Sequence, residues 1–205
     1  LGYQLSVRTR AGGLSSETTA SGRTVPQPVS GLSMLPINDG KVLKLSWSPP
    51  SGYWENYNIL LRNGSEVLVN QSTGKESTQL AFSSLGFGLV PGRLYGADVT
   101  VQSGSLANTA RCYGRLAPGP VQQLLVSHAD ESSLGVLWNQ PAGEWDGYSV
   151  VLRQGKAASV VDRRLLSREA RQCTFYGLTS GCLYSITVAT NSGNLSSSST
   201  VTTRT

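Results

Sequence analysis

Apolar and polar residues alternate along several short segments of this chain. The clearest segments are residues 43–47, 57–61, 94–102 and 184–188, in which every second side chain is apolar. This period of two is typical of half-buried β-strands. Residues that favour turns separate the segments at spacings of about 8 to 12 residues, and no helical period of useful length is present. The pattern therefore predicts an all-β protein.

One strand-and-turn unit occurs three times. Tyr3, Tyr95 and Tyr184 each start an alternating strand, a leucine follows 11 residues later, and an arginine follows 20 residues later. The leucines are Leu14, Leu106 and Leu195, and the arginines are Arg23, Arg115 and Arg204. Fixed spacings in three copies indicate a tandem repeat.

Two further pairs of residues give the length of the repeat. Trp47 and Trp138 lie 91 residues apart, and so do Tyr57 and Tyr148. A unit of about 90 residues is long enough to bury its own core. The 205 residues therefore accommodate two whole domains and part of a third.

Proline-bearing segments mark the expected boundaries, because proline lacks a backbone donor and stiffens the chain. They are Val25-Pro26-Gln27-Pro28 and Ala117-Pro118-Gly119-Pro120. We expect the last two strands of an upstream domain at 1–24, a full domain at 25–116 and another at 117–205. Joints this short predict a semi-rigid row of domains.

About seven short strands, a core tryptophan and a corner tyrosine in each repeat describe an immunoglobulin-like β-sandwich. No Cys…Trp…Cys spacing is present, which excludes an antibody-type domain. The chain resembles the fibronectin type III module over its whole length. The residues that match the pattern of that family are Trp47 and Trp138 on strand B, Tyr57 and Tyr148 on strand C, Leu85 and Leu178 before strand F, and Tyr95 and Tyr184 on strand F. The resemblance implies that the tryptophans, the leucines and the strand F tyrosines are core residues.

Short sequence segments indicate which group of fibronectin type III proteins the chain resembles. Several short segments are similar to ectodomain repeats of receptor-type tyrosine-protein phosphatases. They are Val90-Pro-Gly-Arg-Leu-Tyr95, residues 22–26, residues 144–148, and the Ser-Gly-x-Leu turns at 103–106 and 192–195. The most similar subgroup is that of the vascular endothelial and osteotesticular receptors. This resemblance implies a single-span receptor with many type III repeats outside the cell and a phosphatase inside it.

The two full domains differ directly before the corner tyrosine. When Leu85 is matched to Leu178, residues 86–89 become an insertion of four residues that the second domain lacks. Phe87, which glycines flank, would be costly to expose on such a loop. It either tucks under the sandwich or contacts a partner.

Composition and sequons favour an extracellular setting. Asn63, Asn70 and Asn194 each begin an Asn-x-Ser sequon at positions expected to be exposed. The net charge of +5 is spread along the chain, unlike the clustered charge of a nucleic-acid site. No apolar run approaches the roughly 18 residues of a membrane span. Because Leu1 falls inside a strand pattern, we expect a longer parent protein in which any leader or anchor lies outside this segment.

No catalytic constellation is expected. A tyrosine phosphatase needs Cys-x5-Arg, but Pro118, Thr179 and Val188 stand at the arginine position after the three cysteines. His128, near Asp130 and Glu131, fits an exposed turn residue better than part of a triad, because one local cluster cannot supply convergent geometry. The scattered carboxylates predict no metal site, and no cofactor is expected.

The cysteines leave alternatives open. Cys173 and Cys182 fall at the same end of the second domain, where they can form a disulfide if their Cα atoms lie within about 7 Å. Cys173 at a core position can equally be a buried free thiol. Cys112, near a joint, is the candidate for pairing between chains.

Partner contacts have two further candidates. Trp54 and Trp145 are either exposed anchors for a partner or covers for the end of each sandwich, and their recurrence favours packing. Arg163, Arg164, Arg168 and Arg171 either form a patch for an anionic polysaccharide or, as the interrupting Asp162 and Glu169 favour, a solvated loop with local ion pairs.

Three kinds of parent protein fit these observations. The favoured one is a receptor-type tyrosine phosphatase whose repeats act as a spacer and bind a protein ligand or a neighbouring receptor. The second is a secreted adhesive matrix protein of the fibronectin or tenascin type, although Arg-Gly-Asp is absent. The third, an accessory module of a secreted carbohydrate enzyme, is disfavoured by three adjoining repeats with three sequons.

Overall fold

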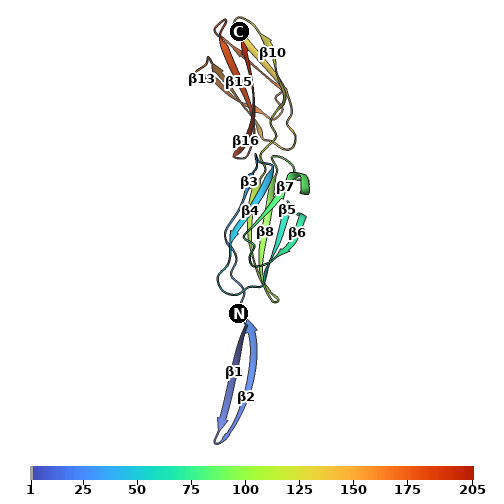
Figure 1. Ribbon diagram of the computed structural model, residues 1–205, viewed down its shortest axis with the longest axis vertical. Helices are drawn as coiled ribbons and strands as arrows, with labels where there is room; N and C mark the ends of the chain where they lie inside the picture. Colours follow the sequence, from blue (N-terminus) through green and yellow to red (C-terminus); the bar gives the residue numbers. More distant parts are fainter. Residues whose placement is uncertain (1) are drawn as a thin grey trace. The chain divides into compact units, whose positions relative to one another are not determined.

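The computed structural model describes residues 2–205, which form β-strands and one very short helix (Figure 1). Contacts divide the chain into two compact units. The first unit comprises Leu1–Met34, Lys44–Ala81 and Tyr95–Gly114. The second unit comprises Leu35–Leu43, Phe82–Leu94 and Arg115–Thr205.

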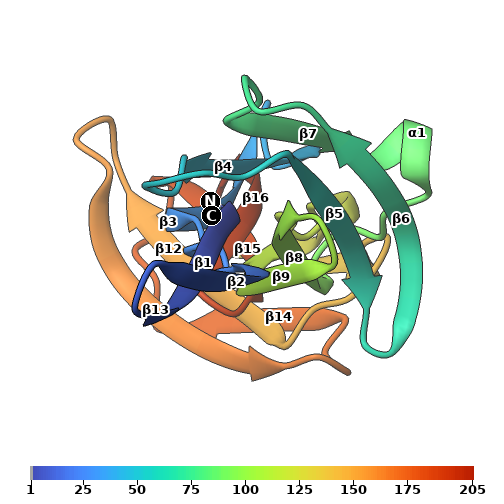
Figure 2. The same cartoon turned by 90° about the horizontal axis from the view of Figure 1, so that it is seen from below.

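Strands β3 to β9 form two sheets. A three-stranded sheet has the order β3-β4-β7, and a four-stranded sheet has the order β6-β5-β8-β9. The strands are β3 (Ser30–Ile37), β4 (Val42–Ser48), β5 (Asn56–Asn63), β6 (Glu66–Thr73), β7 (Gln79–Ser83), β8 (Leu94–Ser103) and β9 (Leu106–Arg115). Figure 2 shows β5 and β6 as neighbouring strands of this second sheet.

Strands β10 to β16 repeat the arrangement within the second unit. Their sheets have the orders β10-β11-β14 and β13-β12-β15-β16. The strands are β10 (Gln122–Ala129), β11 (Ser133–Asn139), β12 (Gly147–Gln154), β13 (Ser159–Ser167), β14 (Gln172–Tyr176), β15 (Leu183–Ser192) and β16 (Leu195–Arg204). A three-stranded sheet paired with a four-stranded sheet is the layout of an immunoglobulin-like sandwich.

The alternating residues predicted from the sequence provide the cores. In the second unit, Trp138 lies 5.5 Å from Tyr148 in an edge-on ring contact. The buried residues around them are Val121, Leu134, Val136, Trp145, Val150, Leu152, Cys173, Phe175, Tyr184, Ile186 and Val188, with Leu178 partly buried against this cluster. In the first unit, Trp47 and Tyr57 form the same edge-on contact at 5.6 Å.

The segment before β8 corrects one expectation. Ser84–Phe87 form the short helix α1, and its N-cap Ser83 accepts a hydrogen bond from the Gly86 backbone N–H at 3.0 Å. Leu85 lies on this helix and is fully exposed. Leu89 is buried instead. The prediction that Leu85 is a core residue is therefore wrong, because the extra residues lie before Leu89.

The N-terminal hairpin consists of β1 (Gly2–Ala11) and β2 (Leu14–Arg23). Its register pairs Tyr3 with Gly22 and ends with Ala11 opposite Leu14. The hairpin β15–β16 has the same register, residue for residue, from Tyr184 opposite Thr203 onward. Tyr3 is nevertheless 56% exposed, whereas Tyr184 is 1% exposed, because no second sheet covers β1 and β2 among the described residues.

Candidate functional site: the ends of the repeats

Arg115 connects two turns that are distant in sequence but lie in the second compact unit. The arginine ends β9, and its Nη1 donates to the backbone oxygen of Gly92 and to Oγ of Ser192, both at 2.7 Å. The Ser192 hydroxyl is buried and donates to the same Gly92 oxygen at 2.7 Å. One carbonyl thus accepts two hydrogen bonds, one of them from a charged donor, and such bonds are the stronger kind.

The backbone fits closely beside this carbonyl. The Glu144 N–H donates to the Pro91 oxygen at 2.9 Å, and Arg93 forms an ion pair with Glu144 at 2.8 Å. Gly92 has a φ of 75°, and a Cβ atom there would lie 1.8 Å from the Glu144 oxygen. A Cβ atom at Gly143 would lie 2.3 Å from the Pro91 oxygen. Both positions therefore require glycine.

An acidic residue holds the turn that follows Ser192. Asp146 accepts a hydrogen bond from the Gly193 N–H at 2.7 Å, and the Asp146 N–H donates to the Asn191 oxygen at 2.8 Å. Arg115 Nε would lie 3.1 Å from a Cβ atom on Gly193. The turn glycine thus lets the arginine lie directly against the backbone.

The first unit contains a related cluster. Arg23 ends β2, and its Nη1 donates to Glu55 Oε1 at 2.7 Å. The other oxygen of Glu55 accepts from the Gly104 N–H at 3.1 Å. The bond from Arg23, followed by the bond from Gly104, holds the pKa of the Glu55 carboxyl below its usual value. A Cβ atom on Gly104 would lie 3.1 Å from Arg23 Nη1, as for Arg115 and Gly193.

A separate ion cluster lies on β8. The buried Asp98 accepts two hydrogen bonds from Arg111, at 2.6 and 3.0 Å, and one from Arg62 at 3.0 Å. The bond from Arg111 is the largest cause that lowers the pKa of Asp98. Because the carboxylate already accepts three bonds, we interpret this cluster as a structural support of the sheet and not as a binding site.

All three cysteines are free thiols in the structure, which agrees with the alternative of Cys173 as a buried free thiol. A bridge between Cys173 and Cys182 stays the other alternative. Cys173 is buried, and its sulfur lies 3.9 Å from Arg164 Nη1. Burial raises the pKa of Cys173, and it raises the pKa of Cys112 to about 11. Thiols with raised pKa values are poor nucleophiles at neutral pH.

The aromatic candidates differ in exposure. Trp145 belongs to the core cluster and is 8% exposed, which contradicts its use as an exposed anchor. Trp54 is half-buried, 6.3 Å from the Tyr57 ring and 5.6 Å from Lys75 Nζ. Phe87 is 41% exposed and contacts Phe82 edge-on at 5.7 Å. Trp54 and Phe87 thus remain candidates for a partner contact, each with part of its ring covered.

The four arginines near β13 are mostly engaged locally. Arg164 donates to Asp162 and to the Thr174 oxygen, and it stacks over Phe175 at 4.5 Å. Arg168 and Arg171 form ion pairs with Glu169 at 3.5 and 3.9 Å. Arg163 is exposed. These contacts fit local ion pairs better than a patch aimed at an anionic polysaccharide. Arg163 and Arg164 lie on strand β13 and not on the expected loop.

The remaining predicted positions lie on the surface. Asn70 and Asn194 are exposed and Asn63 is half-buried, so the sequons stay predictions. His128 is exposed, and Asp130 accepts three hydrogen bonds from Ser132 and Ser133 of its own turn. Within residues 2–205, no group of three or more His, Cys, Asp or Glu side chains could hold a metal ion. In the same residues, no helix is long and apolar enough to cross a membrane.

Sequence reasoning missed the contacts of Gly92, Arg115 and Ser192. The fixed position of the arginine in the repeat was a signal that it has a repeated role. Its partners were not visible, because Gly92 and Ser192 are 100 residues apart.

Comparison with known proteins agrees with this architecture. The fibronectin type III domain model matches residues 26–110 and 119–204. Receptor-type tyrosine-protein phosphatase V of Rattus norvegicus is 25% identical over 202 residues, which are 96% of this chain and 12% of that protein. The chain thus spans about an eighth of the length of this relative.

A solved structure shows the same fold. A two-domain fibronectin type III segment of chicken tenascin matches with a TM-score of 0.60 and 16% identity, covering 86% of this chain and 99% of that chain. The FN1–FN3 domains of chicken CNTN1 match with a TM-score of 0.40 and 15% identity, covering 98% of this chain and 78% of that chain. With both sandwiches matched by the family model, the chain belongs to the fibronectin type III family.

Proposed function

We propose that this chain is part of the extracellular spacer and binding region of a single-span cell-surface receptor of the receptor-type tyrosine phosphatase kind. The observation that supports this parent is the similarity over 96% of the chain to a receptor-type tyrosine-protein phosphatase. The phosphatase activity belongs to the proposed parent, because fibronectin type III repeats are non-catalytic. The parent acts in cell adhesion and signalling and removes phosphate from tyrosine on the cytoplasmic side.

The contacts at the ends of the repeats support a spacer role. Arg115 and Ser192 meet at one backbone oxygen, and Gly92 and Gly143 allow backbone to lie against backbone. These contacts fix a turn by hydrogen bonds and leave little space for large side chains. A spacer of this kind holds a distal binding region away from the membrane.

The binding role has a protein ligand or a neighbouring receptor as its partner. Phe87 and Trp54 are the candidate contacts, because each leaves part of an aromatic ring exposed. Aromatic side chains are enriched among the residues that contribute most to protein interfaces. Asn63, Asn70 and Asn194 would carry glycans in this setting.

The coding sequence that follows Thr205 in the parent tests the receptor assignment. A run of about 20 apolar residues followed by a domain with Cys-x5-Arg supports the proposal. Further repeats that end without such a run contradict it and support the alternative, a secreted adhesive matrix protein of the fibronectin or tenascin type. The likeness to tenascin does not favour that alternative, since it shows the fold alone.

Secretion from animal cells tests the extracellular setting separately. The chain is expressed behind a signal peptide, and its mass is measured before and after glycosidase treatment. A loss of mass that disappears with Asn70→Gln or Asn194→Gln supports the setting and assigns the site. A secreted chain with no glycan at any of the three sequons removes the sequons as support for the extracellular setting.

A polysaccharide partner is tested by binding to a heparin column. If the chain elutes at low salt, and if Arg163→Ala and Arg164→Ala leave that elution unchanged, an anionic polysaccharide is excluded as a partner. Salt-sensitive retention that these two changes abolish would assign the patch.

A further inference from the structure

The first unit contains an incomplete copy of the cluster around Arg115. Ser103 holds the place in its turn that Ser192 holds in the other, since each ends a strand and is followed by glycine. The Ser192 hydroxyl donates to a backbone oxygen, that of Gly92. The Ser103 hydroxyl is buried, and it has no hydrogen-bond partner among residues 2–205. A buried hydroxyl without a partner is costly, so its missing acceptor calls for an explanation.

The spacing of the repeats locates the missing acceptor. Arg115 donates to the oxygen of Gly92, which stands 23 residues before it, and Arg204 donates at 3.0 Å to the oxygen of Gly181, also 23 residues before it. Both glycines have positive φ, 75° and 70°. The position 23 residues before Arg23 is the one directly before Leu1. Arg23 Nη1 itself donates to Glu55 Oε1.

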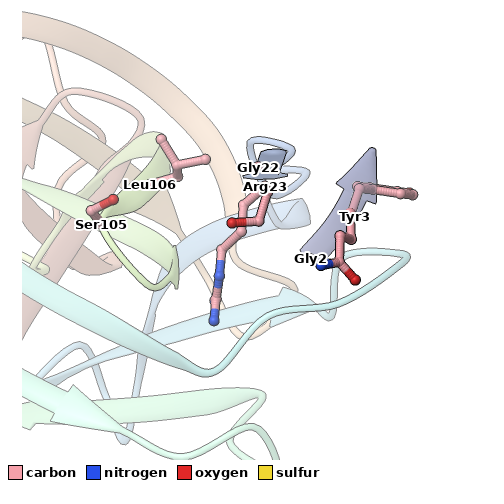
Figure 3. A pocket seen from close by; sticks show the side chains of 8 residues that line it. Gly2, Tyr3, Gly22, Arg23, Ser105 and Leu106 are labelled. Carbon is pink, nitrogen blue, oxygen red and sulfur yellow. The ribbon is translucent and has the colours of Figure 1, made fainter. Parts of the chain in front are cut away.

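Empty space adjoins this arginine. A cavity of about 640 Å³ is lined by Arg23, by Gly2 and Tyr3 at the start of β1, and by Ser105 and Leu106 at the start of β9. Figure 3 shows Arg23 between the strand that carries Tyr3 and the turn that carries Ser105 and Leu106. All of these residues belong to the first compact unit.

One face of β1 is apolar and exposed. Tyr3, Leu5 and Val7 are each more than half exposed. Their counterparts in the matching hairpin, Tyr184, Ile186 and Val188, are fully buried against the rest of their sandwich. The hairpin thus presents an exposed apolar face next to Arg23, whose counterparts Arg115 and Arg204 donate to a glycine oxygen.

We propose that Arg23, Ser103 and Gly104 form a docking site for the backbone turn that closes a preceding fibronectin type III repeat. The occupant is the turn that leads into β1. Its left-handed residue, one position before Leu1, presents a carbonyl oxygen that accepts from Arg23 and from the Ser103 hydroxyl. The strands that belong with this turn cover Tyr3, Leu5 and Val7. This assignment is independent of whether the parent is a receptor or a matrix protein.

The chain itself supplies the probe. Residues 25–92 placed directly before Leu1 put the Val90-Pro91-Gly92 turn into the missing position, with Gly92 joined to Leu1 as it is joined to Arg93 in the first repeat. Ser103→Ala is measured in the 205-residue chain and in this extended chain. Ser192→Ala is the matched control, because its hydroxyl has its acceptor in both proteins.

The expected results are asymmetric. In the 205-residue chain, Ser103→Ala leaves the unfolding midpoint unchanged or raises it, whereas Ser192→Ala lowers it by about 4 to 8 °C, the effect of one net hydrogen bond in a domain of this size. In the extended chain, Ser103→Ala lowers the midpoint by a similar amount. An equal effect of Ser103→Ala in the two chains would overturn the proposal.

Amide hydrogen exchange gives a second readout without substitution. In the extended chain, the amides of Gly104 and Leu106 exchange more slowly than in the 205-residue chain, and those of Tyr3 and Leu5 become protected. Protection of Tyr3 and Leu5 without any change at Gly104 would remove the docking site. An extended chain in which Tyr3 and Leu5 stay unprotected would also count against the proposal, since the hairpin would then not accept the rest of a sandwich.

Discussion

The hydroxyl of Tyr184 accepts a hydrogen bond from the Thr179 backbone N–H at 2.9 Å. Tyr184 is buried, and Thr179 lies in the crossing between β14 and β15, so this bond fastens the crossing to the core. A tyrosine in this place is the corner residue of immunoglobulin-like sandwiches. Its role is structural, and it explains why the repeat pattern begins at a tyrosine.

Replacement of this tyrosine by phenylalanine removes only the hydroxyl. We expect Tyr184→Phe to lower the free energy of unfolding by about 1 kcal/mol, because the ring stays buried and one hydrogen bond is lost. Urea unfolding measures the change. Tyr176→Phe is the control, since Tyr176 is 74% exposed, and it should change stability by less than about 0.5 kcal/mol. Equal effects of the two changes would contradict the corner role.

Gly92 and Gly155 test the close backbone contact. Both have positive φ, 75° and 71°, but a Cβ atom would lie 1.8 Å from the Glu144 oxygen at Gly92 and would meet nothing within 4 Å at Gly155. Gly155→Ala should therefore cost only the conformational strain, about 1 to 2 kcal/mol. Gly92→Ala should cost more than Gly155→Ala, because backbone must also move. Urea unfolding of the two variants makes the comparison, and equal losses would show that the contact yields without cost.

Asp98 gives a prediction about pH. Its pKa is lowered in the folded protein, chiefly by Arg111 and then by Arg62, so the carboxylate contributes stability above its unfolded pKa of about 3.9. That contribution disappears as the pH falls through the lowered folded value. Asp98→Asn should thus cost on the order of 1 to 2 kcal/mol at pH 7, less than a fully buried pair because Arg111 is more than half exposed.

Unfolding by urea between pH 2 and pH 7 separates this effect from packing. The free energies of unfolding of the unsubstituted chain and of Asp98→Asn should approach each other below about pH 4 and differ by a constant amount above it. A difference that stays the same at every pH would mean that the charge of Asp98 contributes nothing. Thr187 lies at the same place in the second repeat and pairs with Thr200 at 2.9 Å, so no matching titration is expected there.

The sequence was sufficient to predict the strands and their inward faces. Leu134, Val136 and Trp138 alternate in the sequence, and all three are buried. Such positions are predictable because the side chains of a strand alternate between two faces, so burial on one face leaves a period of two. The fixed spacing of Tyr95 and Tyr184 then revealed the repeat.

The contacts at the ends of the repeats were not predictable in the same way. Ser192 and the Gly92 oxygen meet across 100 residues, and no periodic pattern encodes that meeting. The pairing of Cys173 and Cys182 was left open for a related reason, because two cysteines at one end of a sandwich need a specific geometry that spacing does not supply.

Leu89 and Leu85 test which leucine of the first domain is the counterpart of Leu178. Leu89 stands six residues before Tyr95, as Leu178 stands six residues before Tyr184, so this spacing identifies the equivalent pair that the matching of Leu85 to Leu178 missed. Leu89 is buried and Leu85 is fully exposed on α1. Leu89→Ala should lower the free energy of unfolding by about 2 to 5 kcal/mol, whereas Leu85→Ala should change it by less than about 0.5 kcal/mol. Both variants remove the same atoms from the same segment, so urea unfolding compares burial alone. A larger loss of stability for Leu85→Ala would identify Leu85 as the counterpart of Leu178.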